Sequence, residues 1–361
     1  MENPDQNNKN KPGKDTSSSS QKDGPETSIN PRYRRQKRYS PDIEEYVEGI
    51  LSGNRTMLSQ AITLIESSNP EHRESGQKIL EECMGATGNS LRIGITGVPG
   101  VGKSTFIESF GTHILEEGHR LAVLAVDPSS SRSKGSILGD KTRMQTLANH
   151  PDTFIRPSPA SGALGGVAHT TRESMLLCEA AGFDIILIET IGVGQSETAV
   201  HSMVDFFLLL MLAGAGDELQ GIKRGIMEMA DLIAINKSDQ ENIHAAKKAR
   251  IEYENALSIL ARDSPARKPS VLTCSATEGT GISEIWNKIK RSAEQSKESS
   301  RFSARRSEQA SWWMHETLNR QLKDRFYNHP EVRNKIKDFE RKVKRGEVSP
   351  FRAAEELLKI I

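Results

Sequence analysis

One glycine-rich stretch, which lies between an apolar run and a helical pattern, constrains the fold of this 361-residue chain more than any other feature. It consists of Gly97, Val98, Pro99, Gly100, Val101, Gly102, Lys103 and Ser104 and matches the pattern G-x-x-x-x-G-K-[ST]. Such glycines let backbone N–H groups turn inward around phosphates, and the start of the next helix adds its dipole. We expect Lys103 to reach the β- and γ-phosphates, the Ser104 hydroxyl to bind Mg²⁺ and Thr105 to donate to the α-phosphate.

The middle of the chain alternates short apolar runs with helical stretches, which is the pattern of βαβ units. The runs expected as strands are 91–96, 121–126, 183–188, 206–212, 232–235 and 270–274. Several are apolar throughout, as strands covered by helices on both faces should be. Together with the glycine-rich stretch, the pattern predicts an α/β fold with a doubly wound, mostly parallel P-loop NTPase sheet, whose chemistry lies at the carboxyl ends of the strands.

Three further segments flank this predicted domain, which we assign to residues 91–290. Residues 1–40 contain only four apolar side chains, Met1, Ile29, Tyr33 and Tyr39, so we expect a disordered, basic and polar tail without an assigned function. Residues 41–90 show three amphipathic helical patterns, the first with Pro41 in its first turn, and predict an amino-terminal helical extension. Residues 291–361 also read as helices.

The carboxy-terminal helical region carries an apolar stripe formed by Trp312, Trp313, Leu318 and Leu322. Such a stripe is most often core or a subunit interface. A helical appendage has little core of its own, so we expect the stripe to be a dimer interface.

Bulk composition excludes several classes of partner. The 49 Lys and Arg residues nearly balance 48 Asp and Glu residues, so the formal net charge of +1 gives no electrostatic reason to expect nucleic acid or an acidic membrane. The three cysteines form no CxxC pair, which argues against a disulfide framework or a thiolate metal site. No apolar run reaches the ~18 residues that span a bilayer, and the amino terminus shows no signal-peptide core, so we expect a soluble cytoplasmic protein.

A second motif, Asn236-Lys237-Ser238-Asp239, follows the run 232–235 and predicts which base is bound. Guanine displays two neighbouring N–H donors that one carboxylate can accept together, whereas adenine lacks this pair. We therefore expect Asp239 to select guanine, Asn236 to hold the loop and the Lys237 stem to pack over the base. A matching second loop against the base is expected from Ser275, Ala276 and Thr277.

A Mg²⁺ ion near the γ-phosphate needs hard oxygen ligands, and three carboxylates at strand ends or in the intervening loop can supply them: Asp127, Asp140 and Glu189. Turn or helix capping is the alternative role for each. Glu189 is favoured because it opens Glu189-Thr190-Ile191-Gly192, where most GTPases carry Asp-x-x-Gly, and it joins Lys103 among the expected catalytic groups.

Hydrolysis would need a group that orients water for in-line attack on the γ-phosphate. Many small GTPases place Gln directly after the switch glycine, but here that position is Val193. Gln195 is the nearby candidate, and Glu197 or a group supplied by a partner are alternatives. The arrangement predicts slow intrinsic turnover that a partner accelerates.

With these motifs the chain resembles the MeaB/ArgK family of SIMIBI-class P-loop GTPases, bacterial relatives of the human methylmalonic aciduria type A protein. The resemblance runs from about Asp42 to Ile361. It is carried by six ordered segments, 94–105, 126–130, 135–144, 189–197, 214–225 and 236–239.

The resemblance implies a homodimeric GTPase that acts as a chaperone for adenosylcobalamin-dependent acyl-CoA mutases, chiefly methylmalonyl-CoA mutase. GTP would gate cofactor loading, and the mutase would be protected from inactivation. By the same resemblance, Ser104, Asp127, Asp140 and Glu189 hold the metal, Gln195 lies in a switch loop and residues 217–225 form a further switch that senses the mutase. The carboxy-terminal helices would form the dimer.

Three other functions fit parts of the sequence. A metallochaperone GTPase for nickel or zinc enzymes shares the motifs, but such proteins usually carry Cys/His clusters that the cysteine spacing here does not provide. An ATP-dependent kinase for transport proteins is opposed by Asp239. A binding module with an inactive pocket is disfavoured by the presence of Lys103, Ser104 and Glu189 together.

Overall fold

The computed structural model describes residues 41–126, 144–157, 164–190, 196–214, 224–260 and 268–361. Residues 1–41 and 42–361 form separate units, and the second is described below. The predicted disordered tail, 1–40, lies outside the described residues.

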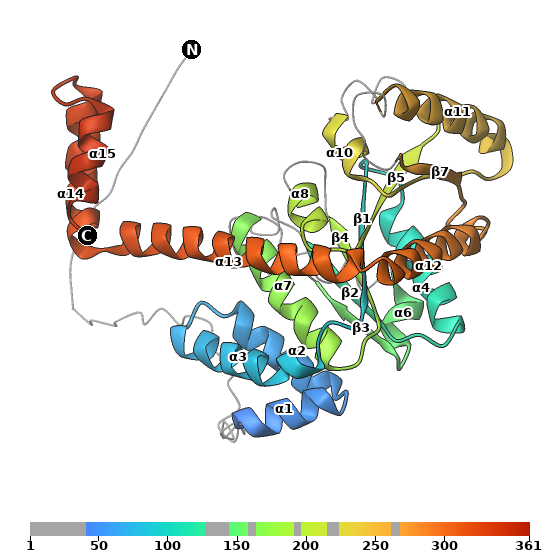
Figure 1. Ribbon diagram of the computed structural model, residues 1–361, viewed down its shortest axis with the longest axis horizontal. Coiled ribbons are helices and arrows are strands. Elements are labelled where there is room, and N and C mark those ends of the chain that lie inside the picture. The colour runs from blue at the N-terminus through green and yellow to red at the C-terminus, as the bar shows by residue number, and fades with distance from the viewer. Residues whose placement is uncertain (1–40, 127–143, 158–163, 191–195, 215–223, 261–267) are drawn as a thin grey trace, which may run out of the picture. The chain divides into compact units, whose positions relative to one another are not determined.

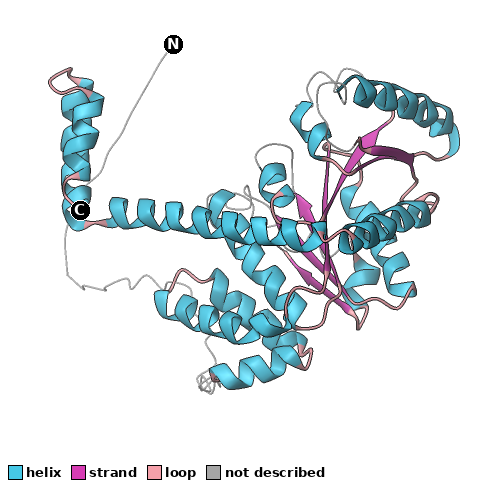
Figure 2. Ribbon diagram, in the orientation of Figure 1, coloured by secondary structure: helices cyan, strands magenta, loops and turns pink. Residues whose placement is uncertain are grey.

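A single parallel sheet lies at the centre of the described chain, with helices on both of its faces (Figures 1 and 2). Its strand order is β3-β2-β4-β1-β5-β6-β7. The strands are β1 (Leu91–Gly97), β2 (Leu121–Val126), β3 (Thr153–Arg156), β4 (Ile185–Thr190), β5 (Phe206–Leu212), β6 (Leu232–Asn236) and β7 (Ser270–Thr273). The chain leaves central β1 toward β2 on one side and later fills β5, β6 and β7 on the other, so the order reverses at β1, where ligands bind in doubly wound folds.

The predicted α/β fold is confirmed, with differences in the strands. β1 and β6 each extend one residue further, to Gly97 and Asn236, and β7 ends one residue earlier, at Thr273. The run expected at 183–188 forms β4 at Ile185–Thr190, so Glu189 and Thr190 belong to the strand rather than follow it. The strand β3 was not predicted, because its four residues at the sheet edge are only partly buried and show no long apolar run. The parallel register places Ile95 of β1 beside Glu189.

Successive residues of the strands enter two different cores, one on each face of the sheet. In β2, Leu121 and Val123 join one core, while Ala122, Leu124 and Val126 join the other. The first core is closed by α4 (Lys103–Glu116), α6 (Gln145–Asn149), α10 (Arg224–Met229), α11 (Ile243–Leu260) and α12 (Ile282–Glu298). The second is closed by α7 (Leu164–Ala180), α8 (Ser196–His201) and the amino-terminal helices.

Three helices precede the sheet, as predicted: α1 (Ile43–Leu51), α2 (Arg55–Glu66) and α3 (Pro70–Cys83). The predicted place of Pro41 in the first turn of α1 is wrong, because Asp42 is the N-cap. Asp42 Oδ1 accepts from the Glu45 N–H at 2.9 Å, and Glu45 Oε2 accepts from the Asp42 N–H at 3.0 Å, which forms a capping box. The apolar face of α2, with Leu58 and Ile62, is buried in the second core.

The carboxy-terminal helices are α13 (Arg301–Asn328), α14 (Pro330–Lys344) and α15 (Pro350–Leu358). Trp313 packs against the second core and donates from Nε1 to the Ser202 carbonyl at 3.2 Å. The other members of the predicted stripe, Trp312, Leu318 and Leu322, are 41%, 48% and 63% exposed. None of the helices in the described parts of the chain combines the length and apolarity needed to cross a bilayer.

A buried ion-pair network fastens α13 to the sheet at the end opposite the glycine-rich stretch. Arg306 contacts Asp205 at 2.6 Å and Glu179 at 3.3 Å. Glu179 in turn accepts from the Nε and Nη2 of Arg92 on β1 at 2.8 and 2.9 Å. Every side chain in the network is at most 12% exposed, so each charge depends on its partners.

We expect Arg306→Met to destabilise the protein by about 3 to 5 kcal/mol, because the buried carboxylate of Asp205 loses its ion-pair partner. The free energy of unfolding from urea titrations measures this loss. Arg341→Met is the matched control, since its pair with Asp338 is solvent-exposed and worth less than about 1 kcal/mol. Equal losses in the two variants would show that the buried network does not hold α13 in place.

Candidate functional site

The predicted phosphate loop connects the carboxyl end of β1 to the start of α4. Gly100 and Gly102 have φ of 76° and 87°, in the left-handed region that glycine adopts without strain. A Cβ on Gly97 would lie 2.5 Å from the Leu210 carbonyl oxygen of β5, so no side chain fits there. Val98 and Val101 are buried and anchor the loop. The loop therefore has the backbone that the sequence pattern requires.

Lys103 lies over the loop with its ammonium group among backbone carbonyls. Its Nζ donates to the Gly97 carbonyl at 2.8 Å and to the Val98 carbonyl at 3.4 Å. Burial lowers the pKa of Lys103, and the nearby charges of Glu189 and Glu197 oppose this shift. An ammonium group held this way can exchange the carbonyls for oxygens of a bound phosphate.

Both acids near Lys103 are buried: Glu189 is 4% exposed and Glu197, in the first turn of α8, is 0% exposed. Ser104 follows Lys103 in the first turn of α4. The other predicted metal ligands, Asp127 and Asp140, lie outside the described residues, as do Gln195 and positions 217–223 of the further switch segment.

Within the described residues, no group of three or more His, Cys, Asp and Glu side chains could hold a metal ion by itself. Because Asp127 and Asp140 lie outside those residues, the predicted set of Ser104, Asp127, Asp140 and Glu189 stays a prediction.

Two threonines that the sequence analysis did not select lie directly beside the phosphate loop. Thr190 Oγ1 donates to Thr96 Oγ1 at 2.8 Å, and both residues are at most 1% exposed. The bond joins the ends of β1 and β4 next to Gly97. The only sequence signal for it is a hydroxyl residue near the end of each of two apolar runs.

The buried side chain of Asn236, which begins the motif 236–239, contacts both the phosphate loop and the second predicted base loop. Its Nδ2 donates to the Val101 carbonyl in the phosphate loop at 2.8 Å. Its Oδ1 accepts from the Ala276 N–H in the second base loop at 3.1 Å. The residue is 2% exposed, so water does not compete for these bonds.

Asp239 faces the second predicted loop. Its Oδ2 accepts from the hydroxyls of Ser275 at 2.7 Å and Thr277 at 3.1 Å. Lys237 has a φ of 60°, a strained value for a residue with a side chain, and its Cε would lie 4.0 Å from a Cβ placed on Gly102. The structure thus brings the two base loops together and places the Lys237 stem beside the phosphate loop.

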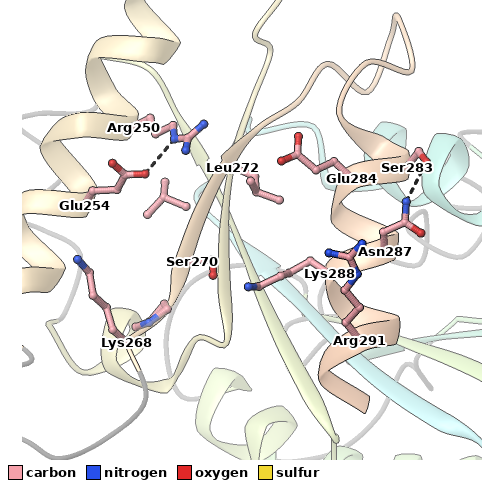
Figure 3. A pocket seen from close by; sticks show the side chains of 12 residues that line it. Arg250, Glu254, Lys268, Ser270, Leu272, Ser283, Glu284, Asn287, Lys288 and Arg291 are labelled. Carbon is pink, nitrogen blue, oxygen red and sulfur yellow. Dashed lines mark hydrogen bonds and ion pairs between the residues drawn. The ribbon is translucent and has the colours of Figure 1, made fainter. Parts of the chain in front are cut away.

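A hollow of about 750 Å³ lies at the outer edge of the sheet, beside β7 and between α11 and α12 (Figure 3). Four cations, Arg250, Lys268, Lys288 and Arg291, are part of its wall, and Arg250 pairs with Glu254 at 2.9 Å. No residue of the phosphate loop or of the base loops lines it. This hollow is therefore separate from the predicted nucleotide site.

Known proteins match this chain over most of its length. The sequence model of the family described as methylmalonyl-CoA mutase-associated GTPase MeaB matches residues 58–331. A Mycobacterium tuberculosis protein named as a probable GTPase is 49% identical over 318 residues, which are 88% of this chain and 95% of the relative. The mouse protein named methylmalonic aciduria type A homolog, mitochondrial, is 47% identical over 327 residues, 88% of this chain and 79% of that protein.

Two further matches carry other names. The Escherichia coli GTPase ArgK is 50% identical over 287 residues, which cover 80% of this chain and 86% of ArgK. The crystal structure of a protein named LAO/AO transport system kinase matches with a TM-score of 0.70 and 39% identity, and the match covers 88% of this chain and 97% of that one. The fold and the order of its elements are therefore shared with a solved structure.

We expect Asn236→Ala to weaken nucleotide binding by roughly 10- to 100-fold, because two loops lose the amide that joins them and two buried backbone groups lose their partner. Titration with a fluorescent guanine nucleotide measures the affinity. Ser238→Ala is the matched control in the same turn, because the substitution keeps its backbone N–H, which donates to the Cys274 carbonyl at 2.9 Å. If both variants bind equally well, Asn236 does not organise the site.

Proposed function

The chain belongs to the MeaB family of methylmalonyl-CoA mutase-associated GTPases, and we propose a specific function for it within that family. Family membership establishes that it binds guanine nucleotides and hydrolyses GTP. We propose that it acts as a chaperone that gates adenosylcobalamin loading of an acyl-CoA mutase, most of all methylmalonyl-CoA mutase, and protects the mutase from inactivation. The observation that carries this proposal is the match of the mutase-associated family over residues 58–331.

Guanine recognition would depend on the carboxylate of Asp239. The hydroxyls of Ser275 and Thr277 fix the orientation of this carboxylate, which supports a rigid acceptor for the two N–H donors of guanine. Asn236 would keep the base loops at a fixed distance from the phosphate loop, and the stem of Lys237 would cover one face of the base.

The phosphates would lie in the loop formed by Gly97, Val98, Pro99, Gly100, Val101 and Gly102, with Lys103 and Thr105 donating to their oxygens. Hard oxygen donors suit Mg²⁺, and the Ser104 hydroxyl and the Glu189 carboxylate both come from elements that meet at this loop. We propose that these two, together with Asp127 and Asp140, hold the ion. When bound, it would neutralise charge on the phosphates.

Hydrolysis would then require Lys103 to stabilise the γ-phosphate and Gln195 to orient water, with Glu197 as the alternative. Glu197 is supported by its burial and by its electrostatic effect on Lys103. Since the Gln that many small GTPases place after the switch glycine is Val193 here, we propose that turnover is slow until a partner completes the site.

We also propose a homodimer formed by the helical region 291–361, with residues 41–90 as an extension of the GTPase domain 91–290. The support is that large apolar side chains remain exposed on α13 and α15 or beyond them: Leu322 at 63%, Phe351 at 81% and Ile361 at 66%. A second copy would cover such side chains. We propose a cytoplasmic location.

We expect Asp239→Asn to exchange the preference for GTP for a preference for xanthosine triphosphate. The amide can donate to the carbonyl that xanthine has in place of the guanine amino group, and it can still accept from Ser275 and Thr277. Loss of the charged acceptor should weaken GTP binding by roughly 10- to 100-fold. Competition against a fluorescent nucleotide measures both affinities. With Glu241→Gln as an exposed control, unchanged GTP affinity of Asp239→Asn would remove Asp239 from the base site.

We expect the purified protein to hydrolyse GTP slowly and ATP at no more than background, and we expect methylmalonyl-CoA mutase from the same source to raise GTP turnover. Release of inorganic phosphate measures both rates, and Lys103→Ala is the control that should lose them. If the mutase leaves GTP turnover unchanged, the GTPase activity stands and the proposed chaperone function is overturned. Phosphate transfer from ATP to a protein would instead favour the kinase function for which the structurally similar LAO/AO transport system kinase is named.

A further inference from the structure

A groove of about 900 Å³ lies between α3, α7 and α13, on the side of the molecule where α13 crosses α7 (Figure 1). Four arginines line it: Arg73 of α3, Arg172 of α7, and Arg320 and Arg325 of α13. Its apolar wall includes Leu176 and Trp313. No residue of the phosphate loop or of the base loops is part of this groove.

Arg172 is buried without a carboxylate partner among the described residues. It is 7% exposed, and its guanidinium lies 4.6 Å from the ring centroid of Trp312 and 5.7 Å from that of Trp313. Its buried Nε has no hydrogen-bond acceptor within the described parts of the chain. Burial lowers the pKa of Arg172 to about 10, the charge of Arg320 lowers it further, and the charge of Glu316 opposes the shift.

Arg320, on α13, is a second arginine of the groove whose Nε lacks a partner in the described chain. Its Nε is also buried and finds no acceptor among the residues that the structure describes. Burial lowers the pKa of Arg320, as does the charge of Arg73, while Glu173 and Asp324 oppose this. The charge of Arg320 is therefore repelled by the charges of both Arg172 and Arg73.

Three acids also line the groove: Glu74, Glu173 and Asp324. Glu74 pairs with Lys78 at 2.8 Å. Glu173 accepts a hydrogen bond from Gln77 through Oε1, whereas its buried Oε2, 3.1 Å from the Nδ1 of His169, has no hydrogen-bond partner in the described chain. Within the described chain neither Arg172 nor Arg320 forms an ion pair with these acids, and each holds a buried Nε–H without an acceptor, which fits an oxoanion from outside the chain.

We propose that this groove is a second anion site, for a small phosphate ester whose phosphate lies between Arg172 and Arg320 and whose apolar part lies on Leu176 and Trp313. A doubly charged phosphate offers acceptors to both buried N–H groups and offsets the repulsion of Arg320 by Arg172 and Arg73. The volume is that of a pocket for a small organic ligand rather than for a single inorganic ion. The site goes beyond the proposed function, since it shares no residue with the nucleotide site.

The test uses the full chain with its nucleotide site saturated by GDP and Mg²⁺, so that phosphate probes cannot compete there. Isothermal titration calorimetry with phenyl phosphate should show saturable binding of one equivalent per chain, tighter than binding of inorganic phosphate. Arg320→Gln should weaken the phenyl phosphate affinity by roughly tenfold or more, and Arg320→Lys should restore part of it. Arg341→Gln on α14 is the exposed control and should bind like the parent protein.

Arg320 is only half-buried, so we expect its variants to fold, and thermal unfolding checks this. The proposal is overturned if phenyl phosphate gives no saturable heat, or if a folded Arg320→Gln variant binds it as the parent does. It is also overturned if Arg320→Gln changes sedimentation from dimer to monomer and leaves the phenyl phosphate affinity unchanged, since the cluster would then belong to an interface between copies. None of these readouts depends on GTP hydrolysis or on a mutase.

Discussion

The position of β1 at the centre of the sheet determines where the other functional parts can lie. The strand is buried on both faces and pairs with β4 on one side and β5 on the other. The close approach of Gly97 to the Leu210 carbonyl leaves no room for a side chain at its carboxyl end. The chain must therefore turn there through glycines, and it turns toward the end of β4, which carries Glu189, and the end of β6, which carries Asn236. The nucleotide motifs meet because three parallel strands end at one edge.

The charged side chains at the two ends of β1 have different partners. At its start, Arg92, Glu179, Arg306 and Asp205 form a closed set of buried ion pairs that holds α13 against the sheet. At its end, Lys103 is partly buried with carbonyl partners and two acids near it, and burial lowers its pKa. A saturated network is rigid, whereas an ammonium group bonded to neutral carbonyls gains when charged phosphate oxygens arrive. The start of β1 thus lies in a rigid ion-pair network, and its end lies at a site that can accept a charged ligand.

The features that the sequence predicted correctly are those set by local pattern. The glycine-rich turn, the apolar strands and the amphipathic α2 each follow from residues close together in the chain. The edge strand β3 was not predicted, because four residues at a sheet edge give almost no periodic signal in the sequence. The proximity of Glu197 to Lys103 and of Arg172 to Arg320 could not be predicted, because both depend on how distant helices pack. Asp127, Asp140 and Gln195 lie outside the described residues, so their roles stay predictions.

Three cations withdrawn from water to different extents show why the groove beside α13 differs from the rest of the molecule. Arg306 has two carboxylates in contact, and Lys103 has carbonyls together with the field of Glu189 and Glu197. Arg172 has mainly the faces of two tryptophans. A cation over an aromatic ring gains about 2 kcal/mol when desolvated, whereas burying an unpaired ion costs several kcal/mol. The aromatic contacts therefore do not offset the free-energy cost of burying Arg172, and repulsion from Arg320 raises that cost. An anion bound in the groove would remove both costs together.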